Sequence, residues 1–286
     1  MERLIDLHTH SCHSDGSMTP KELIAHAKAE GISAIALSDH DCVSGVADAV
    51  REGERLGVEV IPAIELSVVS DTETHILGYF IDPEAPSIQG ALGKIVEMRE
   101  FRARTTCQKL NELGFSVTPD EVKRVAGGSL ICRAHYARVL LDKGYVSSVK
   151  EAFDLYLANG RPAYCGRQAI TAEEAIDIIH AAGGIAFVAH LHLIKLSDEA
   201  LYAYLKELKQ AGLDGIEGYY TDYTEEMHKK YCDMAKELQL QISGGTDFHA
   251  AMKPHIALGR GLGDLRIPYS VLENLKKYYI KEGTKK

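Results

Sequence analysis

The first fifteen residues, Met1-Glu-Arg-Leu-Ile-Asp-Leu-His-Thr-His-Ser-Cys-His-Ser-Asp15, decide the fold, because they place metal-binding side chains at the end of an apolar strand. Residues 3–10, RLIDLHTH, begin as a strand and stop at polar side chains. Side chains two residues apart share one face of an extended chain, so His8 and His10 can reach the same ion. We expect neither Cys12 nor His13 to bind it.

The other predicted strands carry the same kind of side chain. Five further segments read as strands that end in, or carry, residues able to bind metal. These segments are residues 32–40 with His40, 58–67 with Glu65, 73–81 with His75, 185–190 with His190, and 240–249 with Asp247 and His249. In a parallel barrel the carboxyl ends of all strands meet at one face. Ligands from both ends of the chain would converge there, and the pattern predicts a bound metal.

Helices separate most of the predicted strands. Capping boxes at Thr19 and Thr171 each begin a helix that leads into the next strand. This alternation favours an α/β barrel with a parallel sheet. It fails between about residues 85 and 165, where the sequence is mainly helical. We therefore expect a barrel made of residues 1–84 and 166–286, with residues 85–165 inserted as a helical lid subdomain for substrate.

Composition and charge exclude several classes of function. The chain has 286 residues, and its formal net charge of −9 argues against a long nucleic acid as a constitutive partner. We expect no membrane association, because no apolar run approaches membrane-spanning length and the start lacks a secretory signal. The six cysteines form no CxxC pair and are expected to be free thiols in the cytoplasm. No G-x-S-x-G motif competes as a nucleophile, and no obligate protein partner is evident.

Six segments together resemble the PHP (polymerase and histidinol phosphatase) family of metallohydrolases: HTHSCHSDG, LSDHD, AIELS, HILGYF, GGIAFVAH and GGTDFHA. They look most like its stand-alone phosphoesterase branch, which includes nucleoside 3′,5′-bisphosphate phosphatases, 5′-to-3′ ribonucleases and cyclic ribose-phosphate phosphodiesterases. The match covers nearly the whole chain. The resemblance implies a distorted (β/α)7-type barrel with an inserted helical subdomain and a trinuclear site of manganese, iron or zinc.

The resemblance also implies the ligands of three divalent ions, at His8, His10, Asp15, His40, Glu65, His75, His190, Asp247 and His249. Glu65 would bridge two ions, and Glu65, Asp247 and His190 are the expected catalytic residues. The family usually has proline after the histidine of GGIAFVAH, where this chain has Leu191, so the ligand is either His190 or His192. His190 is favoured because it ends the apolar strand.

Substrate contacts are expected from the inserted segment. Within SLICRAHYAR, Arg133 and His135 resemble the family's R-x-H segment, which holds a second phosphate. A guanidinium suits this role because it can bind phosphate through two parallel hydrogen bonds. Ser129, Tyr164 and Arg99 are weaker candidates of the same kind. Outside this segment, Glu217 is expected to partner a ligand histidine, and Lys253 and His255 are candidates to line the pocket.

These observations predict a metal-dependent phosphoesterase for a small phosphorylated nucleotide or sugar. Clustered ions make a bridging water acidic enough to supply hydroxide near neutral pH, and this hydroxide would attack phosphorus. The resemblance implies a nucleoside 3′,5′-bisphosphate or a cyclic ribose phosphate as the substrate. The alternatives are a 5′-to-3′ exoribonuclease acting on short RNA 5′ ends, a histidinol-phosphate phosphatase, an amide hydrolase, and a non-catalytic metal-binding module.

Overall fold

The computed structural model describes residues 3–70, 72–126, 131–166 and 170–283. The chain divides into two compact units. Residues 1–92 and 170–286 form the first unit, and residues 93–169, inserted between them, form the second.

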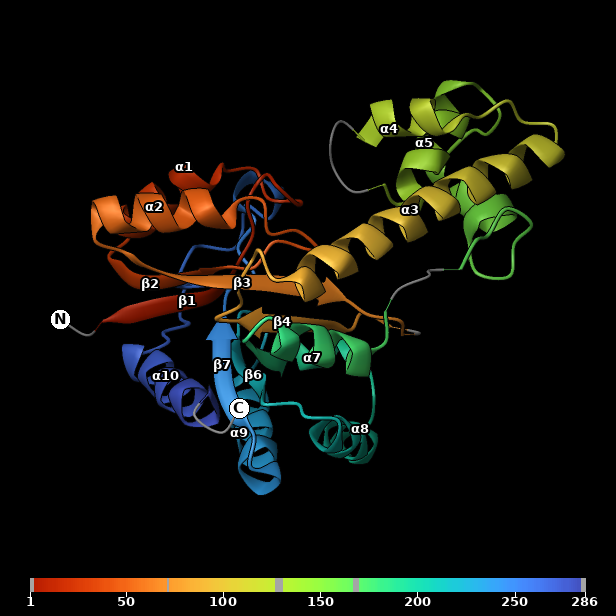
Figure 1. The fold of residues 1–286 in the computed structure, drawn as a ribbon. Helices are drawn as coiled ribbons and strands as arrows, with labels where there is room; N and C mark the ends of the chain where they lie inside the picture. The colour runs from red at the N-terminus through yellow and green to blue at the C-terminus, as the bar shows by residue number, and fades with distance from the viewer. Residues whose placement is uncertain (1–2, 71, 127–130, 167–169, 284–286) are drawn as a thin grey trace. The chain divides into compact units, whose positions relative to one another are not determined.

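The first unit is built on a seven-stranded sheet (Figure 1). Its strands lie in chain order: β1 (Leu4–Thr9), β2 (Ile32–Leu37), β3 (Glu59–Ser67), β4 (His75–Tyr79), β5 (Ile185–Val188), β6 (Gly215–Tyr220) and β7 (Gln241–Gly245). The first and last strands, β1 and β7, lie close together at their carboxyl ends. Just beyond these ends, the His10 amide donates to the Phe248 carbonyl at 2.9 Å. The predicted α/β barrel is thereby confirmed as a mixed, nearly closed barrel.

The sheet differs from an all-parallel barrel at β4. This strand runs antiparallel to both β3 and β5, whereas β1, β2, β3 and the β5–β7 group pair in parallel. The expectation of a purely parallel sheet was wrong at this strand. Because β4 is reversed, its first residue, His75, lies at the edge where β3 and β5 end. The reversal therefore keeps His75 beside the other candidate ligands.

Six helices cover the barrel in the described part of this unit: α1 (Pro20–Ala29), α2 (Val46–Leu56), α7 (Ala172–Ala181), α8 (Asp198–Gln210), α9 (Glu225–Leu238) and α10 (Tyr269–Gly283). The capping boxes at Thr19 and Thr171 form as expected. In Figure 1, α1 and α2 lie against each other, and α10 packs near β1 and β7. Apolar side chains such as Leu7, Leu77 and Phe187 fill the barrel.

The second unit is helical and has its own core. The long helix α3 (Pro86–Glu112) begins in the first unit and continues into the second. It is followed by α4 (Pro119–Ala126), α5 (Arg133–Asp142), α6 (Val149–Ala152) and a turn of π-helix (Phe153–Leu157). Buried side chains from several of these elements, including Leu110, Val122 and Leu140, pack together. Among the described residues, no helix is long and apolar enough to cross a membrane.

Candidate metal centre

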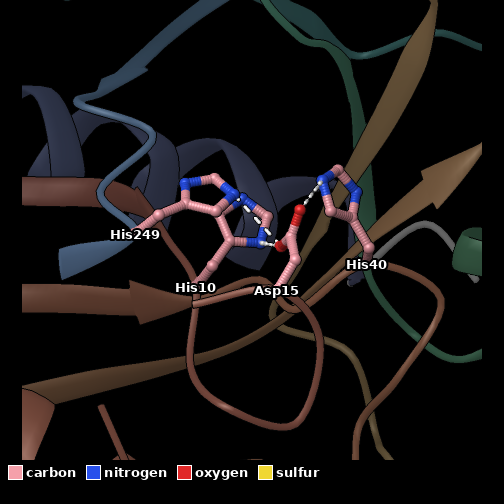
Figure 2. Close-up of side chains that lie close together, drawn as sticks. All are labelled: His10, Asp15, His40 and His249. Atoms are coloured by element: carbon pink, nitrogen blue, oxygen red, sulfur yellow. Dashed lines mark ion pairs between the residues drawn. The ribbon is translucent and has the colours of Figure 1, made fainter. Parts of the chain in front are cut away.

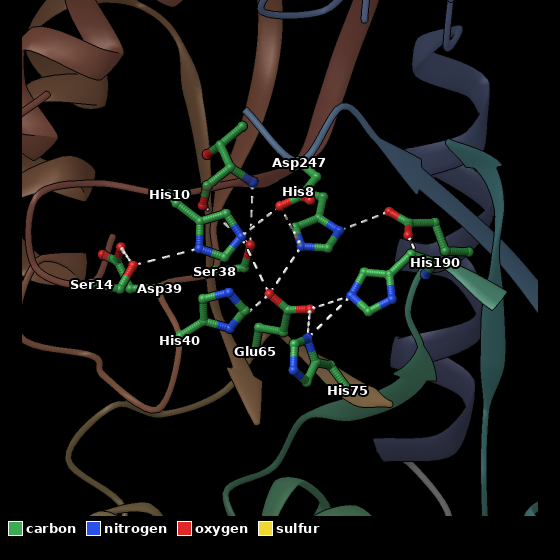
Figure 3. Close-up of polar contacts among 12 residues, drawn as sticks. His8, His10, Ser14, Ser38, Asp39, His40, Glu65, His75, His190 and Asp247 are labelled. Atoms are coloured by element: carbon green, nitrogen blue, oxygen red, sulfur yellow. Dashed lines mark hydrogen bonds and ion pairs between the residues drawn. The ribbon is translucent and has the colours of Figure 1, made fainter. Parts of the chain in front are cut away.

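Glu65 lies at the centre of a group of imidazoles (Figure 3). Its side chain is fully buried near the end of β3. Three imidazole nitrogens lie 3.1, 3.2 and 3.1 Å from its Oε2 atom. Two more lie 2.9 and 3.0 Å from its Oε1 atom. In that order, the histidines are His8, His10, His40, His75 and His190.

Asp247 joins the Oε2 side of this group. Its Oδ1 atom lies 3.1 Å from His10 Nε2 and 3.6 Å from His8 Nε2. With Glu65, these residues offer four buried ligand atoms that all lie within 4.8 Å of one another. The φ angle of Asp247 is 56°, in the left-handed region that a non-glycine residue rarely adopts. Such strain is often found at functional sites.

His75 and His190 meet on the Oε1 side. His75 Nδ1 lies 3.1 Å from His190 Nε2, and both nitrogens face Glu65 Oε1. The structure therefore brings His190 to the cluster. His192 instead points its Nε2 atom towards Asp222, 4.0 Å away. Of the two alternatives after β5, the geometry favours His190 as the ligand.

A third group lies around Asp15 (Figure 2). His249 Nε2 lies 3.1 Å from Asp15 Oδ1, and His40 Nε2 lies 3.8 Å from Asp15 Oδ2. His10 Nδ1 lies 3.8 Å from Asp15 Oδ1. One ligand atom from each of these four residues falls within 4.8 Å of the others. All nine residues that the sequence singles out as ligands thus lie in three adjoining groups.

Burial and nearby carboxylates oppose each other in setting the imidazole pKa values. Burial lowers the pKa of His10, but Asp247 and Glu65 beside it outweigh this effect and raise that pKa to about 9. The same balance raises the pKa of His8 well above its usual value. For His40, burial prevails and holds the pKa well below its usual value. Burial alone would raise the pKa of Glu65, yet the surrounding imidazoles hold it well below its usual range.

The donor set fits divalent cations. His10 Nε2 and His40 Nδ1 are buried and make no hydrogen bond of normal geometry to any described residue, although carboxylate oxygens lie close to both. A cation shared between such nitrogens and oxygens would satisfy both sets of atoms. Imidazoles with carboxylates suit manganese, iron or zinc, whereas a soft thiolate site would need cysteine.

Buried carboxylates hold candidate ligands in place. His8 Nδ1 lies 2.9 Å from Glu217 Oε1, so the Nε2 atom of His8 is left to face Glu65. This contact is the one expected of Glu217, since an imidazole that binds metal usually donates its second N–H to a carboxylate or carbonyl. On another side, Asp39 accepts from the Ser11 amide at 2.7 Å and from the Ser14 hydroxyl at 2.6 Å. These bonds fix the loop that carries Asp15.

Further contacts at the centre come from residues outside the nine candidate ligands. The hydroxyl of Tyr220 donates to Asp247 Oδ2 at 2.9 Å, and Lys253 Nζ lies 2.7 Å from the same oxygen. Of the two residues that the sequence suggests for the pocket lining, Lys253 therefore lies at the centre, whereas His255 is exposed. Exposed Glu73 has a carboxylate oxygen close to His75 and His190. Tyr220 and Glu73 follow no metal-binding spacing, and only the folded chain identifies them.

The expected substrate contacts lie in the second unit. Arg133 is exposed at the start of α5, and its guanidinium lies 5.8 Å from the Phe153 ring centroid and 5.7 Å from that of Tyr164. These distances place it in cation–π range of both rings. Arg133 and Tyr164 are thus brought together.

The remaining three candidates differ in what the structure shows. His135 accepts the Cys132 amide at 3.0 Å through Nδ1, and this contact caps the helix that Arg133 begins. Arg99 is half-buried on α3. Ser129 lies outside the described residues.

Comparisons with known proteins show the family to which the chain belongs. A PHP domain model matches residues 6–253. The 5′-3′ exoribonuclease of Haemophilus influenzae is 35% identical over 250 residues, which cover 87% of this chain and 91% of that protein. The 3′,5′-nucleoside bisphosphate phosphatase of Chromobacterium violaceum is 36% identical over 249 residues, covering 86% and 87% of the two chains. A solved structure from Bifidobacterium adolescentis, described as a metal-dependent phosphoesterase, superimposes with a TM-score of 0.73 at 26% identity and covers 96% of this chain and 95% of its own.

The barrel, its cluster of candidate ligands and these comparisons therefore define a metal-dependent phosphoesterase. The chain belongs to the PHP domain family, as the resemblance of its motifs had indicated.

Proposed function

We propose that the protein hydrolyses a phosphate ester of a small phosphorylated nucleotide or sugar, with a nucleoside 3′,5′-bisphosphate as the leading substrate class. The observation that carries this proposal is the convergence of six candidate imidazole ligands on the carboxylates of Glu65, Asp247 and Asp15. The likeness to a bisphosphate phosphatase over 86% of the chain supports the substrate class.

In this proposal the centre holds three divalent ions, manganese, iron or zinc. Bound there, the ions would act as Lewis acids and lower the pKa of bound water enough to supply hydroxide near neutral pH, which is the nucleophile that hydrolysis of a phosphate ester needs. Glu65 would be shared by two ions, one held with His8, His10 and Asp247 and the other with His75 and His190. Asp15, His40 and His249 would hold the third. Lys253, paired with Asp247 Oδ2, leaves the other oxygen of that carboxylate facing the imidazoles.

The inserted helices, residues 85–165 in the sequence-based division, are proposed to bind the second phosphate. Arg133 supplies the cation, with Tyr164 beside it, and a guanidinium can bind phosphate oxygens in pairs. Arg133 and His135 stay the leading candidates for this contact, and Tyr164, Arg99 and Ser129 stay the weaker ones. A cytoplasmic location also stays a prediction.

A 5′-3′ exoribonuclease is the second candidate, favoured by the 35% identity to the Haemophilus influenzae enzyme. The net charge of −9 disfavours long RNA, since tight binding to many phosphates needs a basic surface. A short 5′ end needs only a local cationic patch.

A substrate panel with metal analysis on the same preparation tests the proposal. The panel contains a nucleoside 3′,5′-bisphosphate, a cyclic ribose phosphate, histidinol phosphate, a short 5′-phosphorylated RNA and an amide. We expect fastest phosphate release from the bisphosphate, and none from any substrate after chelation. Metal-loaded protein that released no phosphate from any phosphate ester would refute the proposal. Faster turnover of the RNA would favour the second candidate.

A further inference from the structure

His190 is held in a backbone conformation that residues other than glycine rarely adopt. Its φ and ψ angles are 28° and 61°, at the point where β5 gives way to a short 3-10 helix, Leu191–Ile194. A conformation of this kind persists only where the surroundings fix it. The ring of His190 reaches Glu65 from this turn, so whatever fixes the turn also aims the ligand.

Two side chains hold two successive amides of this turn. The His190 amide donates to Glu217 Oε2 at 2.7 Å, and the Leu191 amide donates to the hydroxyl of Tyr223 at 2.7 Å. All four residues are buried. An unpaired amide here would therefore have no access to water, and its loss of a partner would carry the full cost of desolvation.

The hydroxyl of Tyr223 has a defined orientation. It lies 3.3 Å from the main-chain carbonyl of Glu217, which can only accept, so the hydroxyl proton points there. Its lone pairs are then free to accept the Leu191 amide. One hydroxyl thus ties the turn after β5 to the middle of β6.

We infer that Tyr223 is a positioning residue for the metal centre, because its hydroxyl fixes the Leu191 amide and thereby the turn that aims His190 at Glu65. The inference rests on the proposed metal centre. Glu217 extends the same support to a second ligand, since its Oε1 atom binds His8 Nδ1. The ligands proposed for two different ions are therefore held by one connected set of buried hydrogen bonds.

The substitution Tyr223→Phe tests this role with little change of shape. The ring stays to pack against Tyr220 and Tyr231, whose centroids lie 5.3 and 4.8 Å away, while the Leu191 amide loses its acceptor. We expect a 10- to 100-fold loss of metal affinity, the usual effect of removing a group that orients a ligand. Metal-depleted protein is titrated with Co²⁺ against a competing chelator, and the visible absorption of the bound ion is recorded. The spectrum should change, because one imidazole is no longer aimed correctly.

Tyr231→Phe is the matched control. It removes the hydroxyl of a neighbouring tyrosine on α9, and this hydroxyl takes no part in the hydrogen bonds that hold the His190 turn. The Co²⁺ affinity of this variant should therefore stay within about twofold of wild type. Metal affinity in Tyr223→Phe equal to that in Tyr231→Phe would overturn the inference. Because affinity is measured without substrate, this result is separate from a failure of the proposed function, which the substrate panel on wild-type protein reports.

A rescue variant sharpens the test. Leu191→Pro removes the donor that Tyr223 serves, at the first position of a helical turn, where proline is tolerated. In that background Tyr223→Phe should cost less than about threefold in affinity, because no buried amide is left unpaired. An equal cost in both backgrounds would show that the hydroxyl acts in another way and would overturn the inference. Should Leu191→Pro fail to fold, the comparison of the two phenylalanine variants decides alone.

Discussion

Raising the pH from 6.5 to 9 should destabilise the metal-free protein. Burial lowers the pKa of His10, but Asp247 and Glu65 outweigh it, so folding raises this pKa from 6.5 to about 9. A group whose pKa is raised by folding stabilises the folded state fully below its unfolded pKa, and that contribution is lost as the pH rises through the folded pKa. The pKa of His8 is also raised, against the effect of burial, by the carboxylates around it, so it acts with the same sign.

The size of the effect follows from the pKa of His10. A shift of about 2.5 pH units at about 1.4 kcal/mol each gives about 3 kcal/mol of stability, lost between pH 6.5 and 9. The side chain of His10 is fully buried, so solvent screening does not reduce this figure. In a chain of this size such a loss lowers the unfolding temperature by roughly 6 to 12 °C. His40, whose burial lowers its pKa, titrates below this window and does not offset the loss.

Thermal unfolding of chelator-treated protein across this pH range measures the slope. His10→Gln should remove much of it, while His13→Gln, at an exposed position outside the cluster, should leave it unchanged. With divalent ions added the trend should reverse, because metal binding displaces protons from the imidazoles and becomes tighter as the pH rises. A metal-free stability that stayed level or rose between pH 6.5 and 9 would refute this reading of the charges around Glu65.

Three further outcomes are expected. Asp247→Ala should lose turnover and bound metal together, because this carboxylate faces His10 in the centre. Elemental analysis and a phosphate-release assay on the same preparation check both losses. An inactive variant with full metal content would contradict the ligand role. Arg133→Ala should raise KM for bisphosphates about 10- to 100-fold through loss of charge-assisted hydrogen bonds, with monophosphates little affected, whereas Arg138→Ala, whose guanidinium pairs with Asp142, should alter neither. An equal rise of KM for bisphosphates and monophosphates in Arg133→Ala would refute the proposed phosphate-binding role of Arg133. Asp39→Asn should lower the free energy of unfolding by about 2 kcal/mol, since Asp39 accepts from two serines in a buried loop; an unchanged urea midpoint would count against it.

Most of the barrel could be predicted from sequence because each strand is a short apolar run with polar residues at one end. The direction of β4 was missed, although the sequence holds the signal. Only residues 68–74 separate β3 from β4, and a parallel pair needs a crossover of a dozen or more residues. An antiparallel turn is therefore the natural connection. It also explains how His75, at the beginning of its strand, lies beside His190, which follows the end of β5.

The contacts that support the candidate ligands were harder to predict. Tyr220 and Tyr223 read as ordinary aromatic residues of a strand and the turn after it, and their roles come from hydroxyl positions fixed by the folded chain. Leu191 is a partial exception, since it departs from the proline usual in the family at that position. Such a departure introduces an amide donor, and the sequence alone does not reveal which side chain accepts it.

The arrangement around Glu65 leaves buried imidazole nitrogens of the metal-free protein without hydrogen bonds in the described part of the chain. Protonation satisfies these polar atoms only in part, because His10 favours the charged form while burial keeps His40 neutral. Each of these two imidazoles retains one nitrogen without a hydrogen bond of normal geometry among the described residues. Divalent ions would neutralise the carboxylates and bind the imidazoles at once. Ions that bind the folded barrel and not the unfolded chain would add their binding free energy to its stability, which would tie the folding of the barrel to the loading of its site.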